Sequence, residues 1–116
     1  MLDAPITEAL SRYLDLQTSR MKLTATNMAN VETPGYRTQG IDTDGEFARA
    51  LGAHGFVDAP TVQETQGLIA RPDGNNVSMD RESMQMAETQ LQFRTGVELL
   101  RHQFTMLSDA IRSDAK

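Results

Sequence analysis

The side chains that could perform catalysis or bind a metal are few and far apart in this sequence. The chain has no cysteine, which excludes thiolate nucleophiles, disulfides and cysteine-ligated metal centres. Its two histidines, His54 and His102, have no partner at the His-x-x-x-His or Glu-x-x-His spacing of helical metal sites. A small metal-dependent enzyme could therefore depend only on these two histidines and on carboxylates from loops.

Three acidic residues, Asp42, Asp44 and Glu46, alternate along the chain as in some calcium loops. An EF-hand loop, however, requires glycine at its sixth position and glutamate at its twelfth. Counted from Asp42, these positions hold Phe47 and Ala53. The sequence also has no glycine-rich phosphate loop and no nucleophile elbow. We therefore expect no catalytic residue, no cofactor, no metal, no small-molecule substrate and no enzymatic activity.

The charge balance excludes further classes of protein. The 116 residues include 11 Lys and Arg against 16 Asp and Glu, which gives a net charge of −5 and a pI of about 4.9. Nucleic-acid binding and polybasic membrane binding both require a basic surface. No apolar run reaches the roughly 18 residues of a membrane span, and the start MLDAPITEAL lacks the basic and apolar regions of a signal peptide. We expect no nucleic-acid partner, no transmembrane segment and no use of the general secretory route.

The sequence divides into three segments, which give the structural elements that would position any functional residue. Residues 1–33 are an N-terminal helix and the start of a turn, residues 34–76 are an irregular middle, and residues 77–116 are a C-terminal helix. We predict a mainly α fold, a single elongated domain in which the two long terminal helices pair as an antiparallel coiled-coil hairpin. In the middle we expect loops and at most one or two short β-hairpins, with candidate strands at 40–42 and 56–58 and a candidate short helix at 45–51.

Both terminal segments carry a heptad seam, in which steps of four and three residues alternate. The C-terminal seam comprises Met79, Ser83, Met86, Gln90, Phe93, Val97, Leu100, Phe104, Leu107 and Ile111. The N-terminal seam comprises Leu10, Leu14, Gln17, Met21, Thr24, Met28 and Val31. We interpret the seams as intrachain core, with contacts to other subunits as the alternative for some positions. Polar seam residues such as Gln17 and Gln90 cost stability and can fix register and choice of partner.

The supply of core residues is small. Leu, Ile, Val and Phe account for 24 residues, roughly 21% of the chain, close to the roughly 20% below which disorder is expected. An isolated copy should therefore be weakly folded, with reduced helicity and fast amide exchange at both ends, and should gain stability from partners. Gly96 lies within the C-terminal helix at a cost of about 1 kcal/mol relative to alanine. It is either a notch for a neighbouring helix or merely tolerated.

Turn signals mark the ends of the two helices. Thr33-Pro34-Gly35-Tyr36 has proline and glycine at the two central positions of a type II turn, which requires a positive φ at the glycine. A second turn, at residues 71–74, precedes the C-terminal helix. That helix has three candidate N-caps, which are Asn76, Ser78 and Asp80.

Two asparagines, Asn27 and Asn30, lie three residues apart on the last turn of the N-terminal helix. They either terminate the helix by bonding to local backbone or form a buried amide network that fixes the turn or contacts a neighbouring subunit. Tyr36 is interpreted as an anchor that packs back on the helices.

Two stretches resemble the signatures of the bacterial flagellar basal-body rod family, most of all its proximal-rod members. In that family an Asn-x-x-Asn pair ends a long helix and a Thr-x-Gly-aromatic turn follows. The matching residues here are Asn27, Asn30, Val31, Thr33, Pro34, Gly35 and Tyr36. The stretch 73–82 resembles the Asn-x-Val-x-Met opening of the family's C-terminal helix, and the residues singled out in it are Asn76, Val77, Met79 and Glu82. With their helices the two motifs cover roughly 75 of the 116 residues.

This resemblance implies a structural subunit of the flagellar rod. Family members are exported through the flagellar type III apparatus without a cleaved signal peptide and polymerise in the periplasm. The paired terminal helices form the inner layer of the tube. The implied partners are further copies, other rod proteins including the FliE adaptor, and the export apparatus. The alternative is a soluble cytoplasmic helical-hairpin adaptor or export chaperone, which would share the acidic, cysteine-free and amphipathic composition.

Overall fold

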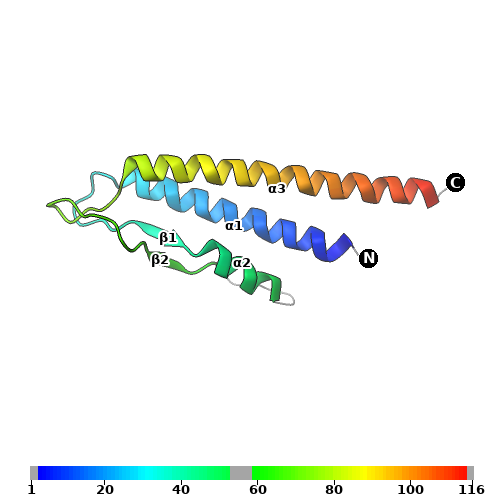
Figure 1. The fold of residues 1–116 in the computed structure, drawn as a ribbon, viewed down its shortest axis with the longest axis horizontal. Coiled ribbons are helices and arrows are strands. Elements are labelled where there is room, and N and C mark those ends of the chain that lie inside the picture. Colours follow the sequence, from blue (N-terminus) through cyan, green and yellow to red (C-terminus); the bar gives the residue numbers. More distant parts are fainter. Residues whose placement is uncertain (1–2, 53–58, 115–116) are drawn as a thin grey trace.

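A computed structural model describes residues 3–52 and 59–114 of the chain. The elements are, in order, α1 (Asp3–Ala29), β1 (Gln39–Ile41), α2 (Thr43–Gly52), β2 (Val62–Glu64) and α3 (Met79–Asp114). Helices α1 and α3 lie side by side and run in opposite directions, so that both ends of the chain lie at the same end of the molecule (Figure 1). The predicted mainly α fold with two paired terminal helices is confirmed.

The molecule is strongly elongated. It measures 70 × 26 × 18 Å, with a radius of gyration of 18.3 Å, whereas a compact domain of this length would have a radius near 13 Å. Helix α3 has 36 residues, about 54 Å at 1.5 Å per residue, and it extends beyond the N-terminal end of α1 (Figure 1). None of the helices in the described ranges combines the length and hydropathy of a membrane-crossing segment.

The middle of the chain folds into a short arm, formed by β1, α2 and β2, that lies along α1 on the side away from α3 (Figure 1). Strands β1 and β2 pair antiparallel, with Gln39 opposite Glu64 and Ile41 opposite Val62. Helix α2 is fixed to α1 by an edge-on contact between the rings of Tyr13 and Phe47, whose centroids lie 5.6 Å apart. The expected short β structure is present as a two-stranded sheet, although α2 lies between its strands in the chain and they do not form a tight hairpin. The helix expected at 45–51 is confirmed, whereas the candidate strand 56–58 and His54 lie outside the described residues.

The turn chemistry agrees with the sequence. Gly35 has φ of +75°, and the Tyr36 N–H donates to the Thr33 carbonyl at 3.2 Å, as a type II turn requires. The N–H of Gly74, whose φ is +88°, donates to the Arg71 carbonyl at 2.8 Å. Ser78 is the N-cap of α3, because its Oγ accepts a hydrogen bond from the Arg81 N–H at 3.3 Å.

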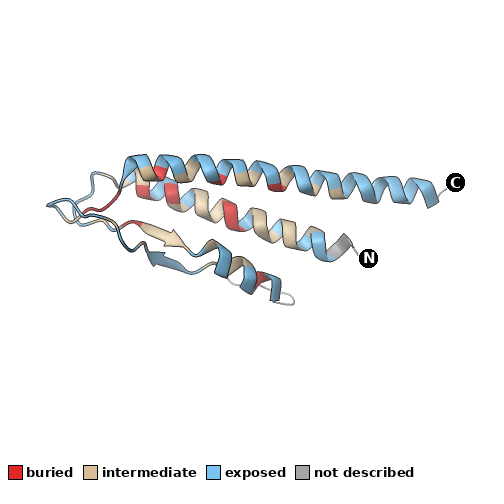
Figure 2. Ribbon diagram, viewed as in Figure 1, coloured by how far each residue is buried: buried red, intermediate tan, exposed pale blue. Residues whose placement is uncertain are grey.

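The interior is small and largely polar. Only three apolar side chains in the described ranges are buried, namely Leu16, Ala50 and Val77. The largest fully buried side chains are all polar: Gln17, Asn27, Thr38, Asn75, Glu82 and Thr89. The buried positions extend from the loops to about the middle of the hairpin, and none is seen in the last turns of α3 (Figure 2). The expectation of a small hydrophobic core is therefore met.

The face that α3 turns toward α1 differs from the predicted seam. The buried residues of α3 are Glu82, Thr89 and Gly96, which are spaced by seven, whereas Gln90 is exposed. The reason is close helix packing. A Cβ at Gly96 would lie 2.8 Å from Cδ2 of Leu14, so α1 packs directly against this glycine. The notch at Gly96 thus receives the chain's own N-terminal helix.

The apolar positions of the predicted α3 seam differ in exposure along the helix. Those that are half-buried are Met86, Phe93, Val97 and Leu100, and those that are exposed are Met79, Phe104, Leu107 and Ile111. In α1 the polar seam residues Gln17 and Thr24 are buried as expected, while Leu10, Leu14, Met21 and Met28 are half-buried. Val31, just after α1, is also half-buried.

Candidate functional site

Asn27, on the last turn of α1, is the centre of a buried hydrogen-bond network. Its Nδ2 donates to the Gln39 carbonyl at 2.9 Å and to Oε2 of Glu82 at 3.1 Å. Its Oδ1 accepts from the Tyr36 hydroxyl at 2.9 Å and from the Gln39 N–H at 3.1 Å. Both donors and both acceptor positions of the amide are thus used. With 1% of its surface exposed, Asn27 joins α1, the signature turn, β1 and α3.

Glu82 is a carboxylate that is 1% exposed on the first turn of α3. Besides Asn27 it accepts a hydrogen bond from Nη1 of Arg81, at 2.7 Å to its Oε1. Burial of the Tyr36 hydroxyl, and secondarily the negative charge of Glu82, raise the pKa of Tyr36 above its ordinary value. The hydroxyl therefore remains protonated and able to donate to Asn27.

Asn75 and Asn76 fix the loop that enters α3. Nδ2 of Asn75 donates to the carbonyls of Asn30 and Thr33 at 2.9 and 2.8 Å, and its Oδ1 accepts from the Val77 N–H at 2.8 Å. Oδ1 of Asn76 accepts from the Thr38 N–H at 2.6 Å. The two amides thereby satisfy backbone groups from segments about 40 residues apart.

Asn30 acts locally, in contrast to Asn27. Its Nδ2 donates to the Thr26 carbonyl at 2.8 Å, and its Oδ1 accepts from the Thr33 hydroxyl at 3.0 Å. It closes the helix end and braces the turn. Of the two interpretations offered by the sequence, helix termination therefore describes Asn30, and a buried amide network describes Asn27.

We call the set Asn27, Asn30, Tyr36, Asn75, Asn76 and Glu82 the polar junction. Its groups are paired by hydrogen bonds, and in the described ranges no three His, Cys, Asp or Glu residues are placed to hold a metal ion. What the arrangement does chemically is to connect the two terminal helices with each other and with the arm. Sequence reasoning singled out five of these residues but not Asn75, although it stands beside Asn76 in the Asp-Gly-Asn-Asn run.

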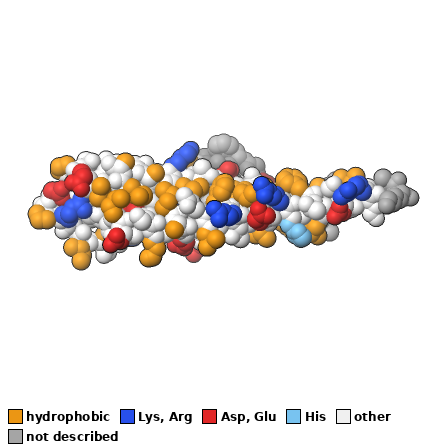
Figure 3. Space-filling model, turned by 90° about the horizontal axis from the view of Figure 1, so that it is seen from above, with side chains coloured by type: hydrophobic (Ala, Val, Ile, Leu, Met, Phe, Trp, Pro, Cys, Tyr) orange, Lys and Arg blue, Asp and Glu red, His pale blue; other side chains and the backbone are white. Residues whose placement is uncertain are grey.

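At the opposite end of the hairpin, apolar side chains of α3 are exposed to solvent. Five apolar residues of the C-terminal part of α3 are exposed, and we call them the apolar stripe: Leu99, Phe104, Met106, Leu107 and Ile111. Apolar side chains are visible along much of the surface of the molecule (Figure 3). The described part of α1 ends before it can cover the last turns of α3 (Figure 1). Phe104, Leu107 and Ile111 follow one another at helical spacings of three and four residues, and gathered apolar surface is typical of sites of protein association.

The comparisons with known proteins agree on one family. No family model matches the chain. Over 117 residues it is 32% identical to the flagellar basal body rod protein FlgB of Cereibacter sphaeroides, in an alignment that covers 90% of this chain and 91% of the relative. It is 30% identical over 121 residues to FlgB of Escherichia coli, with 86% and 88% covered, and 24% identical over 123 residues to FlgB of Borrelia hermsii, with 87% and 91% covered. The similarity therefore extends well beyond the two signature motifs.

Proposed function

The chain belongs to the FlgB family of flagellar basal body rod proteins, whose role is structural, and we propose that its copies polymerise through their terminal helices. The polymer would be the proximal part of the periplasm-spanning shaft that motility requires. The observation that carries the proposal is the apolar stripe, since Phe104 is 55% exposed and Ile111 62% exposed in a single copy. Burial of such side chains by neighbouring subunits is favourable at about 25 cal/mol per Å².

The shape of the molecule also supports assembly. With three buried apolar side chains in the described ranges, a single copy gains little from its own core. An elongated hairpin offers long helical faces on which neighbouring helices can pack. We propose that the neighbours are further copies and other rod proteins, including the FliE adaptor.

The polar junction has a separate part in this proposal. It sets how the terminal helices lie against each other, and thereby which apolar side chains face outward. We further propose that the chain reaches the basal body through the flagellar type III export apparatus, without a cleaved signal peptide.

The direct test is removal of residues 101–116, which takes away most of the apolar stripe and leaves every residue of the polar junction. We expect cells that carry this variant as their single copy to build no rod and to be non-motile. The matched control replaces His102, Thr105 and Asp109, three exposed polar residues of the same helix segment, with serine and should swim normally.

Cell fractionation gives a second readout. The full-length protein should be recovered with purified basal bodies. Normal motility of the truncated variant would overturn the proposal, and so would recovery of the full-length chain in the cytosol alone.

A further inference from the structure

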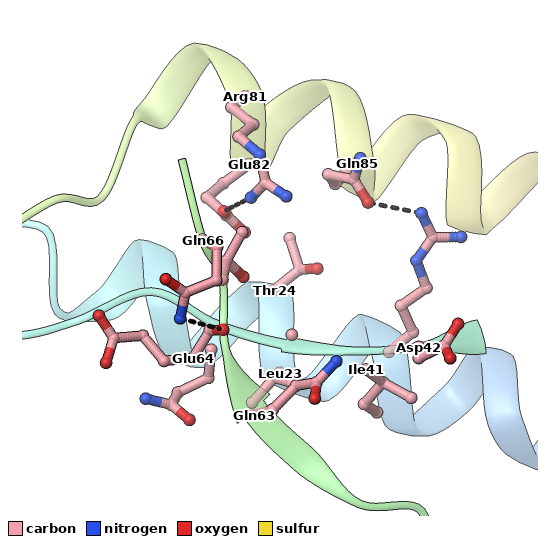
Figure 4. Close-up of a pocket in the computed structure, with 14 residues that line it drawn as sticks. Leu23, Thr24, Ile41, Asp42, Gln63, Glu64, Gln66, Arg81, Glu82 and Gln85 are labelled. Carbon is pink, nitrogen blue, oxygen red and sulfur yellow. Dashed lines mark hydrogen bonds and ion pairs between the residues drawn. The ribbon is translucent and has the colours of Figure 1, made fainter. Parts of the chain in front are cut away.

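A groove runs between the arm and the helical hairpin. Its larger section, about 660 Å³, lies between the first turns of α3 and the two strands and is lined mainly by polar side chains (Figure 4). A smaller section of about 360 Å³ continues from it along α1, and both sections share Arg20, Ile41 and Asp42. We call the smaller section the slot. Its other lining residues include Gln17, Asp44 and Glu88.

Gln17, which lines the slot, carries a buried polar atom that lacks a partner within the described residues. Gln17 is 1% exposed, and its Oε1 has no hydrogen bond with any residue in the described ranges. A buried acceptor without a donor costs about 1–3 kcal/mol. Oε1 of Gln17 therefore lacks a hydrogen-bond donor within the described residues.

The charges around the slot indicate what kind of donor fits. Arg20 is its one basic residue, and this side chain is already engaged by Glu88, with Nη2 3.6 Å from the carboxylate, and by Gln85 and Gln92. Asp42 caps the start of α2 by accepting from the Gly45 N–H at 3.3 Å. Neither Asp42 nor Asp44 has an ion pair within the described part of the chain. A cationic donor would meet two carboxylates at the rim and the amide oxygen of Gln17.

We propose that the slot receives Arg94 of a second copy of this chain. The planar guanidinium has five N–H donors, so it can bond to Oε1 of Gln17 while it faces Asp42 and Asp44. Arg94 is exposed and forms no hydrogen bond or ion pair with the described residues. The inference rests on the proposed function, because it requires neighbouring copies.

The position of Arg94 agrees with an open polymer. It lies two residues before Gly96, about 200° around the helix, and therefore on the face of α3 opposite α1. The slot opens beside the arm. A contact between two different surfaces of the same chain is heterologous, and if its rotation does not close it continues from copy to copy as a filament. Leu91, which is 64% exposed on the same outer face as Arg94, would be covered by the same contact.

Cross-linking tests the contact in assembled basal bodies. The chain has no cysteine, so Asp44→Cys and Arg94→Cys can be introduced on two separately tagged copies. A short bismaleimide is the suitable reagent, because an arginine side chain separates the two Cα atoms by more than a disulfide spans. The control pair combines Asp44→Cys with Lys22→Cys, which replaces an exposed cation of α1. We expect the Asp44–Arg94 pair to cross-link at least about tenfold more than the control pair.

Charge reversal supplies an independent readout with the purified full-length chain. Arg94→Glu should weaken self-association by about tenfold or more, and Asp44→Arg on the second copy should restore it. Cross-linking no greater than in the control pair would overturn the inference, as would reversal without loss or without rescue. Basal bodies that lack the wild-type chain altogether would instead overturn the proposed function, and with it this inference.

Discussion

The two ends of the α1–α3 hairpin differ in which groups they bury and which they expose. At one end the polar junction buries amides, a carboxylate and a hydroxyl, and nearly every one of these groups has a partner within the chain. At the other end the apolar stripe remains in solvent, and α3 continues past the helix that would cover it. Asn27 is 1% exposed, whereas Phe104 is 55% exposed.

The two ends differ in the kind of interaction that each offers. Hydrogen bonds are directional, and a buried polar group without a partner costs free energy. The polar junction therefore favours the one arrangement of the helices and the arm in which its groups are paired. Apolar burial is non-directional and accepts different neighbours. The polar junction therefore connects the described elements at one end, while the apolar stripe is left in solvent at the other.

The largest effect is expected at the polar junction, from Asn27→Ala. Removal of the Asn27 amide takes one hydrogen bond from Oε2 of Glu82 and further bonds from the Tyr36 hydroxyl and the Gln39 backbone. We therefore expect the free energy of unfolding to fall by about 3 kcal/mol. Urea denaturation followed by circular dichroism measures the change. Gln90→Ala, which truncates an exposed amide of α3, should stay within about 0.5 kcal/mol. Equal losses in the two variants would mean that the junction does not hold this end together.

A smaller effect is expected from Tyr36 at alkaline pH. Its raised pKa means that the unfolded chain ionises first, so the stability that Tyr36 contributes is complete below about pH 10 and is lost as the pH rises further. Tyr36→Phe should flatten the alkaline decline in the urea midpoint. Tyr13→Phe, which retains the ring that contacts Phe47, is the matched control. An unchanged alkaline decline in Tyr36→Phe would argue against a shielded hydroxyl.

The smallest effect on stability is expected at the apolar stripe. Phe104→Ser should change the stability of an isolated copy by less than about 0.5 kcal/mol, because the ring already faces solvent. Its incorporation into basal bodies should nevertheless decrease. Leu16→Ala, at a buried position of α1, should by contrast cost about 2 kcal/mol or more in the same denaturation experiment. A large loss for Phe104→Ser would show that the chain covers its own apolar stripe.

Local signals in the sequence predicted much of the fold. Heptad spacing located both long helices, and the proline and glycine of Thr33–Tyr36 predicted a turn that Gly35 adopts with φ of +75°. The short helix at 45–51 and one strand were also foreseen. These features depend on neighbours within a few positions, which a single sequence displays directly.

The contacts between distant segments were harder to predict. Asn27 bonds to residues 12 and 55 positions away, and no local pattern pairs them. The buried line of α3, formed by Glu82, Thr89 and Gly96, was not predicted, because a count of apolar residues does not find polar and small residues at a helix contact. Gly96, which has no side chain, permits the close approach of α1. The slot, likewise, exists only after the arm folds back along α1.

The bonds of Asn27 also bear on sliding of one long helix along the other. A shift of α3 along α1 by a single residue is about 1.5 Å, which is enough to break the 3.1 Å hydrogen bond between Asn27 and Glu82. Contacts between apolar side chains are non-directional and would tolerate the same shift. A joint of this kind resists shear parallel to its long axis. The bonds that oppose such a shift lie where the chain passes from α1 through the signature turn toward the start of α3.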